Sequence, residues 1–126
     1  MRSKIHRAVV TEADPDYMGS ITLDPLLIEA ADLLCNEQVD IYNVSNGNRL
    51  TTYVLAGRRG SGQVCLNGAA ALLCAPGDQV LVVAYAQLDE QEAQAFSSRT
   101  ALLGPKNRVR QVIVRPNAPV PARKRR

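Results

Sequence analysis

The stretch QVDIYNVSNGNRLTTYVLA, residues 38–56, decides the fold because it predicts a β-hairpin. Residues 38–44 alternate polar and apolar side chains, as a half-buried strand does, and residues 49–56 are rich in β-branched and aromatic residues. Between them, SNGN at 45–48 contains the Asn-Gly pair that favours a tight hairpin turn. The sequence therefore predicts two antiparallel strands near the centre of the chain.

The segments outside this hairpin predict more short strands and few helices. Strands are expected at residues 4–11, 19–23, 63–66, 79–86 and 109–114, and helices at residues 24–34, 67–73 and 89–96. In the first helix, Asp24 is expected as the cap and Pro25 as the first helical residue. Its expected apolar face consists of Leu26, Leu27, Ala30, Leu33 and Leu34. Many short strands at close spacing predict a mainly β chain, folded as a compact β-barrel with two or three short helices.

Size and composition fit one domain with a buried core. The chain has 126 residues, of which 46% are hydrophobic, and we expect a single domain over residues 1–116. No apolar run approaches the roughly 20 residues of a membrane span. Residues 1–10 lack the apolar stretch of a secretory signal. These observations predict a soluble, cytoplasmic protein with no membrane partner.

Charge divides the chain into an acidic body and a basic end. Residues 1–98 hold all 12 acidic residues and only 6 of the 15 Lys and Arg residues, which gives a net charge of −6. Residues 99–126 hold the other 9 basic residues and no acid, which gives +9. The last ten residues, 117–126, are rich in proline and basic side chains, so we expect a disordered tail there.

The residue types exclude several common kinds of site. Cys35, Cys65 and Cys74 have no paired spacing, and we expect buried or semi-buried free thiols in a reducing compartment. His6 is the only histidine, so we expect no metal site. The sequence has neither a phosphate-binding P-loop nor the glycine fingerprint of dinucleotide-binding proteins.

The polar residues that remain fall into four separated segments. Lys4 and His6 have the two-residue spacing that places side chains on one face of a strand. The other candidates are Tyr17, Gly19 and Ser20, then Arg49, Thr52 and Tyr53, and finally the run NGAAA at residues 67–71. Each has an ordinary explanation by itself, because Gly-Ser pairs favour turns and surface cations are usually solvated. The start of a helix after Asn67 would present free backbone N–H groups to an anion.

The four segments together resemble the pyruvoyl-dependent aspartate 1-decarboxylase family. The resemblance rests on KIHR (4–7), YMGS (17–20), IYNVSNGNRLTTY (41–53) and LNGAAA (66–71), and it extends from about Lys4 to about Ala95. The sequence departs from the family pattern at Tyr42, where we expect a tryptophan.

This resemblance implies a double-psi β-barrel that assembles into a homotetramer with active sites between subunits. It also implies autocatalytic cleavage between Gly19 and Ser20, which leaves a β chain of residues 1–19 and an α chain of residues 20–126. Ser20 would become a covalent pyruvoyl group, and Thr52 would donate to the oxyanion of the cleavage step. No metal and no pyridoxal phosphate would be needed.

The implied reaction converts L-aspartate to β-alanine and CO₂, a supply step for pantothenate. The substrate amine would form a Schiff base with the pyruvoyl ketone, and Tyr53 would donate the proton to Cα. Arg49, with Lys4, would hold a substrate carboxylate, and we favour the retained side-chain carboxylate. Thr52 and the backbone of Gly68, Ala69 and Ala70 would also bind substrate. The supporting residues would be His6, Tyr17 and Asn67.

Two alternatives belong to other functional classes. A small basic β-barrel is also typical of nucleic-acid-binding modules, but the barrel portion here is acidic and the chain has one Phe, four Tyr and no Trp. A barrel with a dead site is the other alternative, although all motif residues are present. The sequence leaves open whether cleavage needs an accessory processing protein.

Overall fold

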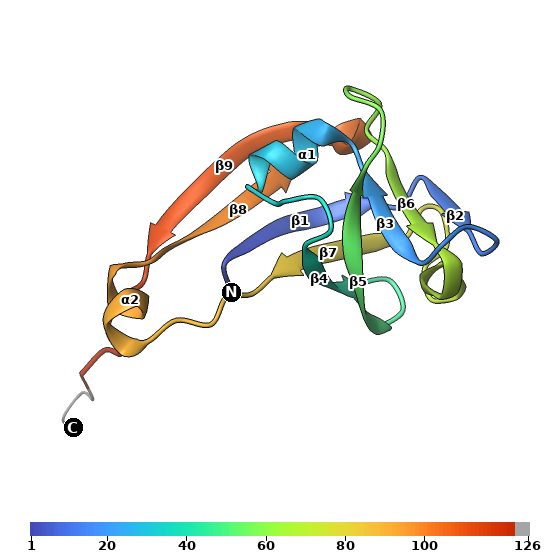
Figure 1. The fold of residues 1–126 in the computed structure, drawn as a ribbon. Helices are drawn as coiled ribbons and strands as arrows, with labels where there is room; N and C mark the ends of the chain where they lie inside the picture. Colours follow the sequence, from blue (N-terminus) through green and yellow to red (C-terminus); the bar gives the residue numbers. More distant parts are fainter. Residues whose placement is uncertain (123–126) are drawn as a thin grey trace.

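The computed structural model describes residues 1–122 and confirms a mainly β chain with short helices (Figure 1). The strands of this part are β1 Ser3–Val9, β2 Glu12–Asp14, β3 Ser20–Leu23, β4 Gln38–Asn43, β5 Arg49–Ala56, β6 Val64–Asn67, β7 Gln79–Ala84, β8 Ser97–Leu103 and β9 Val109–Pro116. The helices are α1 Pro25–Ala30 and α2 Glu90–Ala95, with two 3₁₀-helices, η1 Gly68–Leu72 and η2 Pro105–Asn107. In residues 1–122, no helix has the length and apolar character that a membrane crossing needs. Residues 123–126 of the expected tail lie outside the described residues.

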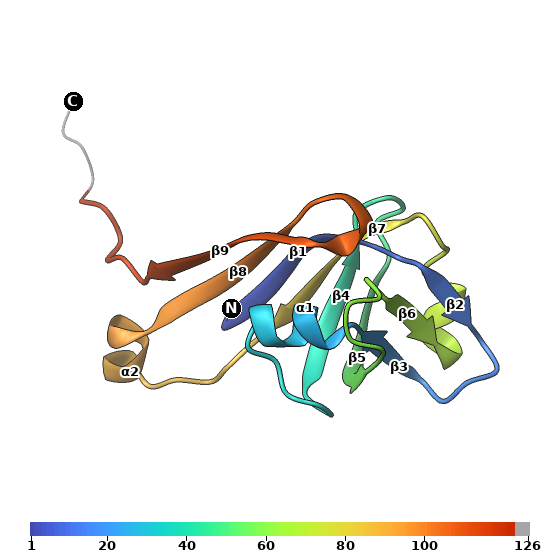
Figure 2. The same cartoon turned by 90° about the horizontal axis from the view of Figure 1, so that it is seen from above.

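The strands form one curved sheet in the order β2-β6-β3-β5-β4-β7-β1-β8-β9. Figures 1 and 2 show β2, β3 and β6 at one end of the molecule and the long β8 and β9 ribbon at the other. The ladder does not close, because β2 and β9 remain its edges. Two residues between β1 and β2 nevertheless contact distant segments, since Val10 N–H donates to Asp78 O at 2.9 Å and Thr11 N–H donates to Val64 O at 2.8 Å. The curved sheet is consistent with the predicted small β-barrel. The double-psi connection of that barrel stays a prediction.

The hairpin predicted from residues 38–56 is confirmed. β4 and β5 pair antiparallel, with Gln38 opposite Tyr53 and Tyr42 opposite Arg49. Gly47 has a φ of +82°, which a glycine adopts at little cost. The other edge of β4 pairs with β7, so the hairpin lies in the middle of the sheet.

Aliphatic side chains that alternate along the strands fill the core. Ile5 and Ala8 on β1, Val39 and Ile41 on β4, and Val80 and Val82 on β7 are almost completely buried. Burying each Val or Ile side chain contributes about 1.5–3 kcal/mol. Ile21 and Leu23 on β3 and Leu66 on β6 belong to the same core. Hydrophobic packing therefore anchors β3, which follows Gly19, and the part of β6 that precedes Asn67.

Helix α1 is shorter than the predicted helix over residues 24–34. Asp24 caps it as predicted, because its carboxylate accepts the Leu26 N–H at 2.9 Å. The helix ends at Ala30, since Asp32 takes a φ of +54° that a helix cannot accommodate. The predicted apolar face was partly wrong, because Leu26 and Leu34 are 42% and 71% exposed. The buried apolar residues of this segment are Leu27, Ile28, Ala31 and Leu33.

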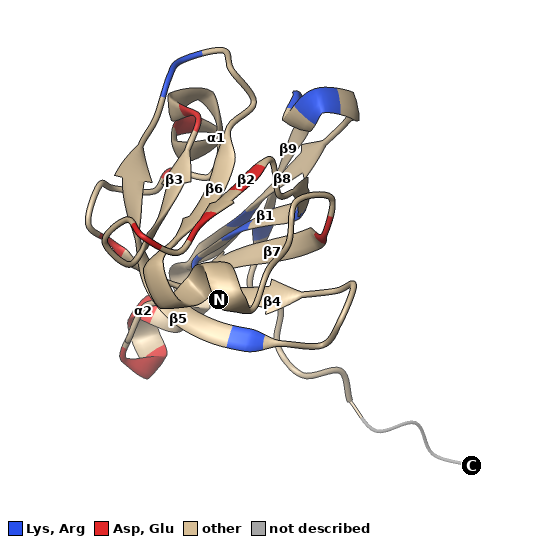
Figure 3. Cartoon of the chain, turned by 90° about the vertical axis from the view of Figure 1, so that its right-hand side faces the viewer, with Lys and Arg blue, Asp and Glu red and all other residues tan. Residues whose placement is uncertain are grey.

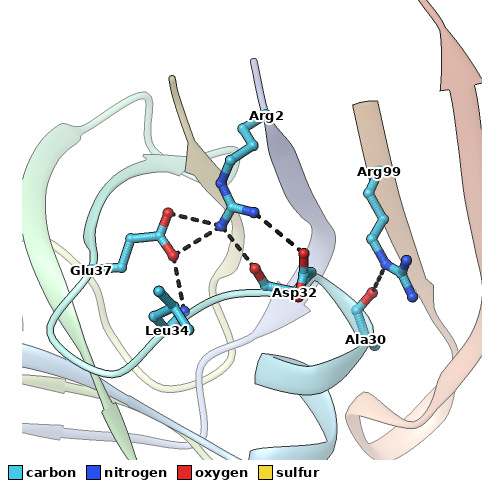
Figure 4. A network of polar contacts seen from close by, with 6 residues as sticks. All are labelled: Arg2, Ala30, Asp32, Leu34, Glu37 and Arg99. Carbon is cyan, nitrogen blue, oxygen red and sulfur yellow. Dashed lines mark hydrogen bonds and ion pairs between the residues drawn. The ribbon is translucent and has the colours of Figure 1, made fainter. Parts of the chain in front are cut away.

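A polar network ties the turn after α1 to the sheet (Figure 4). Arg2 donates to both carboxylate oxygens of Glu37, at 2.9 and 2.8 Å, and lies 3.7 Å from a carboxylate oxygen of Asp32. Arg99 Nε donates to the Ala30 carbonyl at 2.7 Å. These bonds attach the end of α1 to residues at β1 and β8, and they fix the point where β4 begins.

Strands β2 and β8 were not predicted, and the ends of some elements differ from the prediction. β8 pairs parallel with β1 and antiparallel with β9, and β2 pairs parallel with β6. The predicted helix over residues 67–73 is the 3₁₀-helix η1, β7 ends at Ala84, and β9 continues to Pro116. Acidic positions lie on β2 and α2 (Figure 3).

Candidate active site

The predicted cleavage point lies where an exposed loop enters the sheet. Tyr17 and Met18 are 55% and 77% exposed, whereas Ser20, the first residue of β3, is fully buried. β3 pairs antiparallel with β6, and Ser20 lies directly opposite Asn67. Gly19 therefore joins a solvent-exposed loop to a buried, hydrogen-bonded strand.

Two hydrogen bonds hold the Ser20 hydroxyl. Ser20 Oγ donates to the Met18 carbonyl at 3.2 Å and accepts from Asn67 Nδ2 at 2.9 Å. The same nitrogen donates to Thr22 Oγ1 at 3.0 Å. Asn67 immediately precedes η1 but makes no side-chain capping bond to it. The Asn67 side-chain amide thus donates to the two hydroxyls of β3 and does not cap η1.

Gly68 lets the NGAAA segment touch the loop before Ser20. Its φ is +64°, and a Cβ added there would lie 2.7 Å from Gly19 Cα and 3.0 Å from the Tyr17 carbonyl oxygen. Both separations are shorter than ordinary van der Waals contact, which begins near 3.4 Å. A side chain at this position would push the loop away, so glycine is required for the close approach.

A pocket of about 300 Å³ opens beside Gly19. It is lined by Gly19, by residues 50–53 of β5, and by Ala69, Ala70 and Leu73 at η1. β3 pairs with β5 only from Val54 onward, so the earlier residues of β5 border the gap. Thr52 and Tyr53 therefore line the same pocket, although neighbouring strand side chains point to opposite faces.

The structure places Lys4 and His6 in a different groove of about 370 Å³. They share it with Ser98 and Thr100 of β8 and Arg115 of β9. Burial lowers the pKa of His6, and the charges of Lys4 and Arg7 lower it further. The ring nitrogen Nδ1 of His6 is buried without a hydrogen-bond partner among the described residues. Within one chain, this cationic groove is separate from the pocket at Gly19.

Arg49 lies at the start of β5 and stacks on Tyr42, with the guanidinium carbon 4.1 Å from the ring centre. The Tyr42 hydroxyl is 2.7 Å from the Tyr85 hydroxyl and donates to Asp40 at 3.3 Å. The hydrogen bond with Tyr42 raises the pKa of Tyr85. Tyr42, at the position where a tryptophan is expected, thus holds the Arg49 side chain through its aromatic face.

Sequence reasoning missed two partners of the Asn67 side chain. Thr22 accepts one of its hydrogen bonds, and the Cys65 thiol donates to Asn67 Oδ1 at 3.2 Å. Spacing could have found both, because Thr22 follows Ser20 by two strand residues and Cys65 precedes Asn67 by two. All three cysteines are free, as predicted, although Cys35 is exposed.

Other features of the described residues do not add to this pocket. A cavity of about 600 Å³ beside α1 and η2 contains none of the predicted site residues. Among residues 1–122, no three His, Cys, Asp or Glu side chains are grouped so that they could hold a metal ion. The polar groups in contact with Ser20 are the Met18 carbonyl and the Asn67 amide, and that amide also contacts the Thr22 hydroxyl.

Comparisons with known proteins find relatives over most of the chain. The family model described as aspartate decarboxylase matches residues 1–110. The aspartate 1-decarboxylase of Acetivibrio thermocellus is 51% identical over 109 residues, which cover 86% of each chain. The aspartate 1-decarboxylase of Pelotomaculum thermopropionicum is 50% identical over 112 residues, 89% of this chain and 85% of the relative. That of Bacillus velezensis is 47% identical over 113 residues, 90% of this chain and 89% of the relative.

Proposed function

The chain belongs to the aspartate decarboxylase family, and on that premise we propose that it decarboxylates L-aspartate to β-alanine with a pyruvoyl group made from its own Ser20. The reaction is a carbon–carbon lyase step that supplies β-alanine for pantothenate. One observation carries the proposal for the site. The buried Ser20 hydroxyl accepts a hydrogen bond from the Asn67 amide. The preceding residue, Gly19, lines a pocket together with Thr52 and Tyr53.

Self-cleavage begins at the Gly19–Ser20 peptide bond. Ser20 Oγ bonds to the Gly19 carbonyl carbon, the C–N bond breaks, and the hydroxyl proton passes to the Ser20 nitrogen. Thr52, which lines the pocket with Gly19, donates to the carbonyl oxygen while it carries negative charge. Loss of the Ser20 α-proton then expels the Gly19 carboxylate, and water replaces the nitrogen, which leaves as ammonia. Residues 1–19 and 20–126 become separate chains.

The residues around Ser20 fit the group that this cleavage would leave. Gly68 forms a cradle that a Cβ would fill, and the pocket at Gly19 gives a substrate access. The pyruvoyl group supplies a ketone that holds the substrate amine and accepts the electron pair released with CO₂. Tyr53 delivers a proton to the substrate Cα from the wall of this pocket.

Arg49 is proposed to bind the carboxylate that the substrate retains, with help from Lys4. The planar guanidinium suits bidentate recognition of a carboxylate, and its stacking on Tyr42 limits its orientations. A cation fixed on the departing carboxylate would stabilise the ground state and slow the reaction. The backbone at Ala69 and Ala70, beside Gly68, borders the pocket at Gly19 and is proposed to contact the substrate.

We propose that the active site forms between the subunits of a homotetramer. This assembly would explain why Lys4 and His6 line a groove separate from the pocket at Gly19 in one chain. His6 and Tyr17 would then support the site across the interface. The cytoplasmic location stays a prediction.

Replacement of the nucleophile tests the proposal. Ser20→Ala removes both the attacking oxygen and the source of the ketone, so we expect one uncleaved chain and no decarboxylation. The control is Ser3→Ala, because Ser3 is another fully buried serine on β1 whose hydroxyl has no partner in the described chain. Intact mass spectrometry should find two chains for wild type and Ser3→Ala. Two chains from Ser20→Ala would refute the mechanism.

A further inference from the structure

The series of buried hydrogen bonds at Ser20 and Asn67 continues to a residue that has no assigned role so far, Cys65. Cys65 is 5% exposed, and its thiol sulfur lies 3.2 Å from Asn67 Oδ1. Cys65 and Asn67 are two residues apart on β6, so their side chains lie on one face of the strand. On the other side of the amide, Asn67 Nδ2 contacts the hydroxyls of Ser20 and Thr22.

The direction of each bond in this chain follows from chemistry. The Met18 carbonyl can only accept, so the Ser20 proton points to Met18 and the Ser20 oxygen accepts from Asn67. The nitrogen of the Asn67 amide must therefore face Ser20, and the amide oxygen must face Cys65. An S–H group is a donor for that oxygen.

We propose that Cys65 is a positioning residue for self-cleavage, because its S–H bond keeps the Asn67 amide in the orientation that holds the Ser20 hydroxyl beside Gly19. The inference rests on the proposed function, since it assigns Ser20 the role of nucleophile. Without the thiol donor, the amide gains a second orientation that places Oδ1 toward Ser20. The Ser20 proton is then drawn toward Asn67 in place of Met18, and the attacking oxygen loses its donor.

The surroundings keep Cys65 in the form that donates. Burial raises the pKa of the Cys65 thiol, and the carboxylates of Glu12 and Asp14 raise it further. Both acids lie on β2, which pairs with β6 so that Glu12 is opposite Cys65 and Asp14 opposite Asn67. A thiolate at this position would repel the amide oxygen and remove the donor.

Three variants separate this role from simple packing. Cys65→Ala removes the donor. We expect the conversion of precursor to two chains to slow roughly tenfold, the rate factor that corresponds to the loss of one hydrogen bond. Cys65→Ser restores an O–H donor, and we expect a rate within about threefold of wild type. The matched control is Cys74→Ala, because Cys74 is similarly buried, at 2% exposure, and its side-chain hydrogen bond is with Asn43 instead of Asn67. This variant should cleave at the wild-type rate.

The assay follows freshly purified precursor by intact mass spectrometry as a function of time and pH. In wild type, cleavage should slow as the thiol ionises at alkaline pH, relative to Cys65→Ser, which has no thiol to ionise. This comparison tests the proposal even where Cys65→Ala fails to fold.

Several results would overturn the inference. These are wild-type cleavage rates in Cys65→Ala, an equal slowing in Cys74→Ala, slow cleavage in Cys65→Ser, or identical pH profiles for wild type and Cys65→Ser. If wild type does not cleave, or Ser20→Ala does, the proposed function fails with the inference. If wild type cleaves, Ser20→Ala does not, and Cys65→Ala behaves as wild type, the inference alone fails.

Discussion

Gly68→Ala should damage both the stability of the precursor and its cleavage. Two separate costs arise from the geometry. An alanine at a φ of +64° costs about 1–2 kcal/mol, because its Cβ crowds the backbone in the left-handed region. The added Cβ would also lie 2.7 Å from Gly19 Cα, and overpacking of this kind costs about 1–3 kcal/mol. We therefore expect a loss of roughly 2–5 kcal/mol in the free energy of unfolding.

The effect on cleavage follows from the atoms that must move. Gly19 carries the scissile carbonyl, and it must shift by roughly 0.7–1 Å to restore ordinary contact with the new Cβ. A misplacement of this size reduces rates about 10²-fold in well-oriented reactions. We therefore expect precursor of Gly68→Ala to convert to two chains roughly 10²-fold more slowly than wild type.

A matched control isolates the close approach from the backbone strain. Gly47 has a φ of +82°, but a Cβ there would meet nothing within 4 Å. Gly47→Ala should therefore lose stability and keep the wild-type cleavage rate. Chemical unfolding would be measured in the Ser20→Ala background so that all proteins stay uncleaved, and cleavage would be followed by intact mass spectrometry. Equal cleavage rates for Gly68→Ala and Gly47→Ala would refute the reasoning.

The remaining predictions concern catalysis, the tail and the α1 cap. Tyr53→Phe should still cleave but lose roughly 10²- to 10⁴-fold in turnover, whereas Thr52→Ala should accumulate precursor on denaturing gels; the opposite pattern would reverse the two roles. Deletion of residues 118–126, which keeps the Asn117 bonds to the end of α2, should change kcat/KM by less than about twofold, and a tenfold loss would place the tail in the enzyme. Burial raises the pKa of Asp24, but backbone N–H bonds and the charge of Arg59 outweigh it and lower the pKa below 3.8, so Asp24 stabilises the fold above that pH and loses this effect as pH falls through its folded-state pKa. Asp24→Asn should therefore cost about 2 kcal/mol at neutral pH and almost nothing in acid, and a cost independent of pH would contradict this.

Local chemistry in the sequence determined the central hairpin and the start of α1. The Asn-Gly pair and the alternation on each side were enough to predict β4 and β5, because a tight turn sets the register between neighbouring strands. Asp24 and Pro25 likewise predicted where α1 begins, because capping depends on residues within one turn. The end of α1 was not predictable in this way, since no glycine or proline marks it.

β8 shows what the sequence alone could not decide. Residues 97–103 begin with polar side chains and have no clear alternation, so they did not predict a strand. They form one because β1 and β9 supply hydrogen-bonding edges on both sides. Strand formation here depends on partners far away in the sequence more than on intrinsic preference.

At the candidate site too, the sequence indicated which residues take part, and the tertiary structure decided which of them lie together. The motifs named Gly19, Ser20, Thr52, Tyr53 and Asn67 as candidates, and the family resemblance implied their roles. The contact between Ser20 and Asn67, which are 47 residues apart, exists only because β3 pairs with β6 in one register. The tertiary structure also separated the groove of Lys4 from the pocket at Gly19 and brought Cys65 into line with the Asn67 amide. Such contacts come from the packing of distant strands, and a shift of one residue in register would turn each of these side chains to the other face of the sheet.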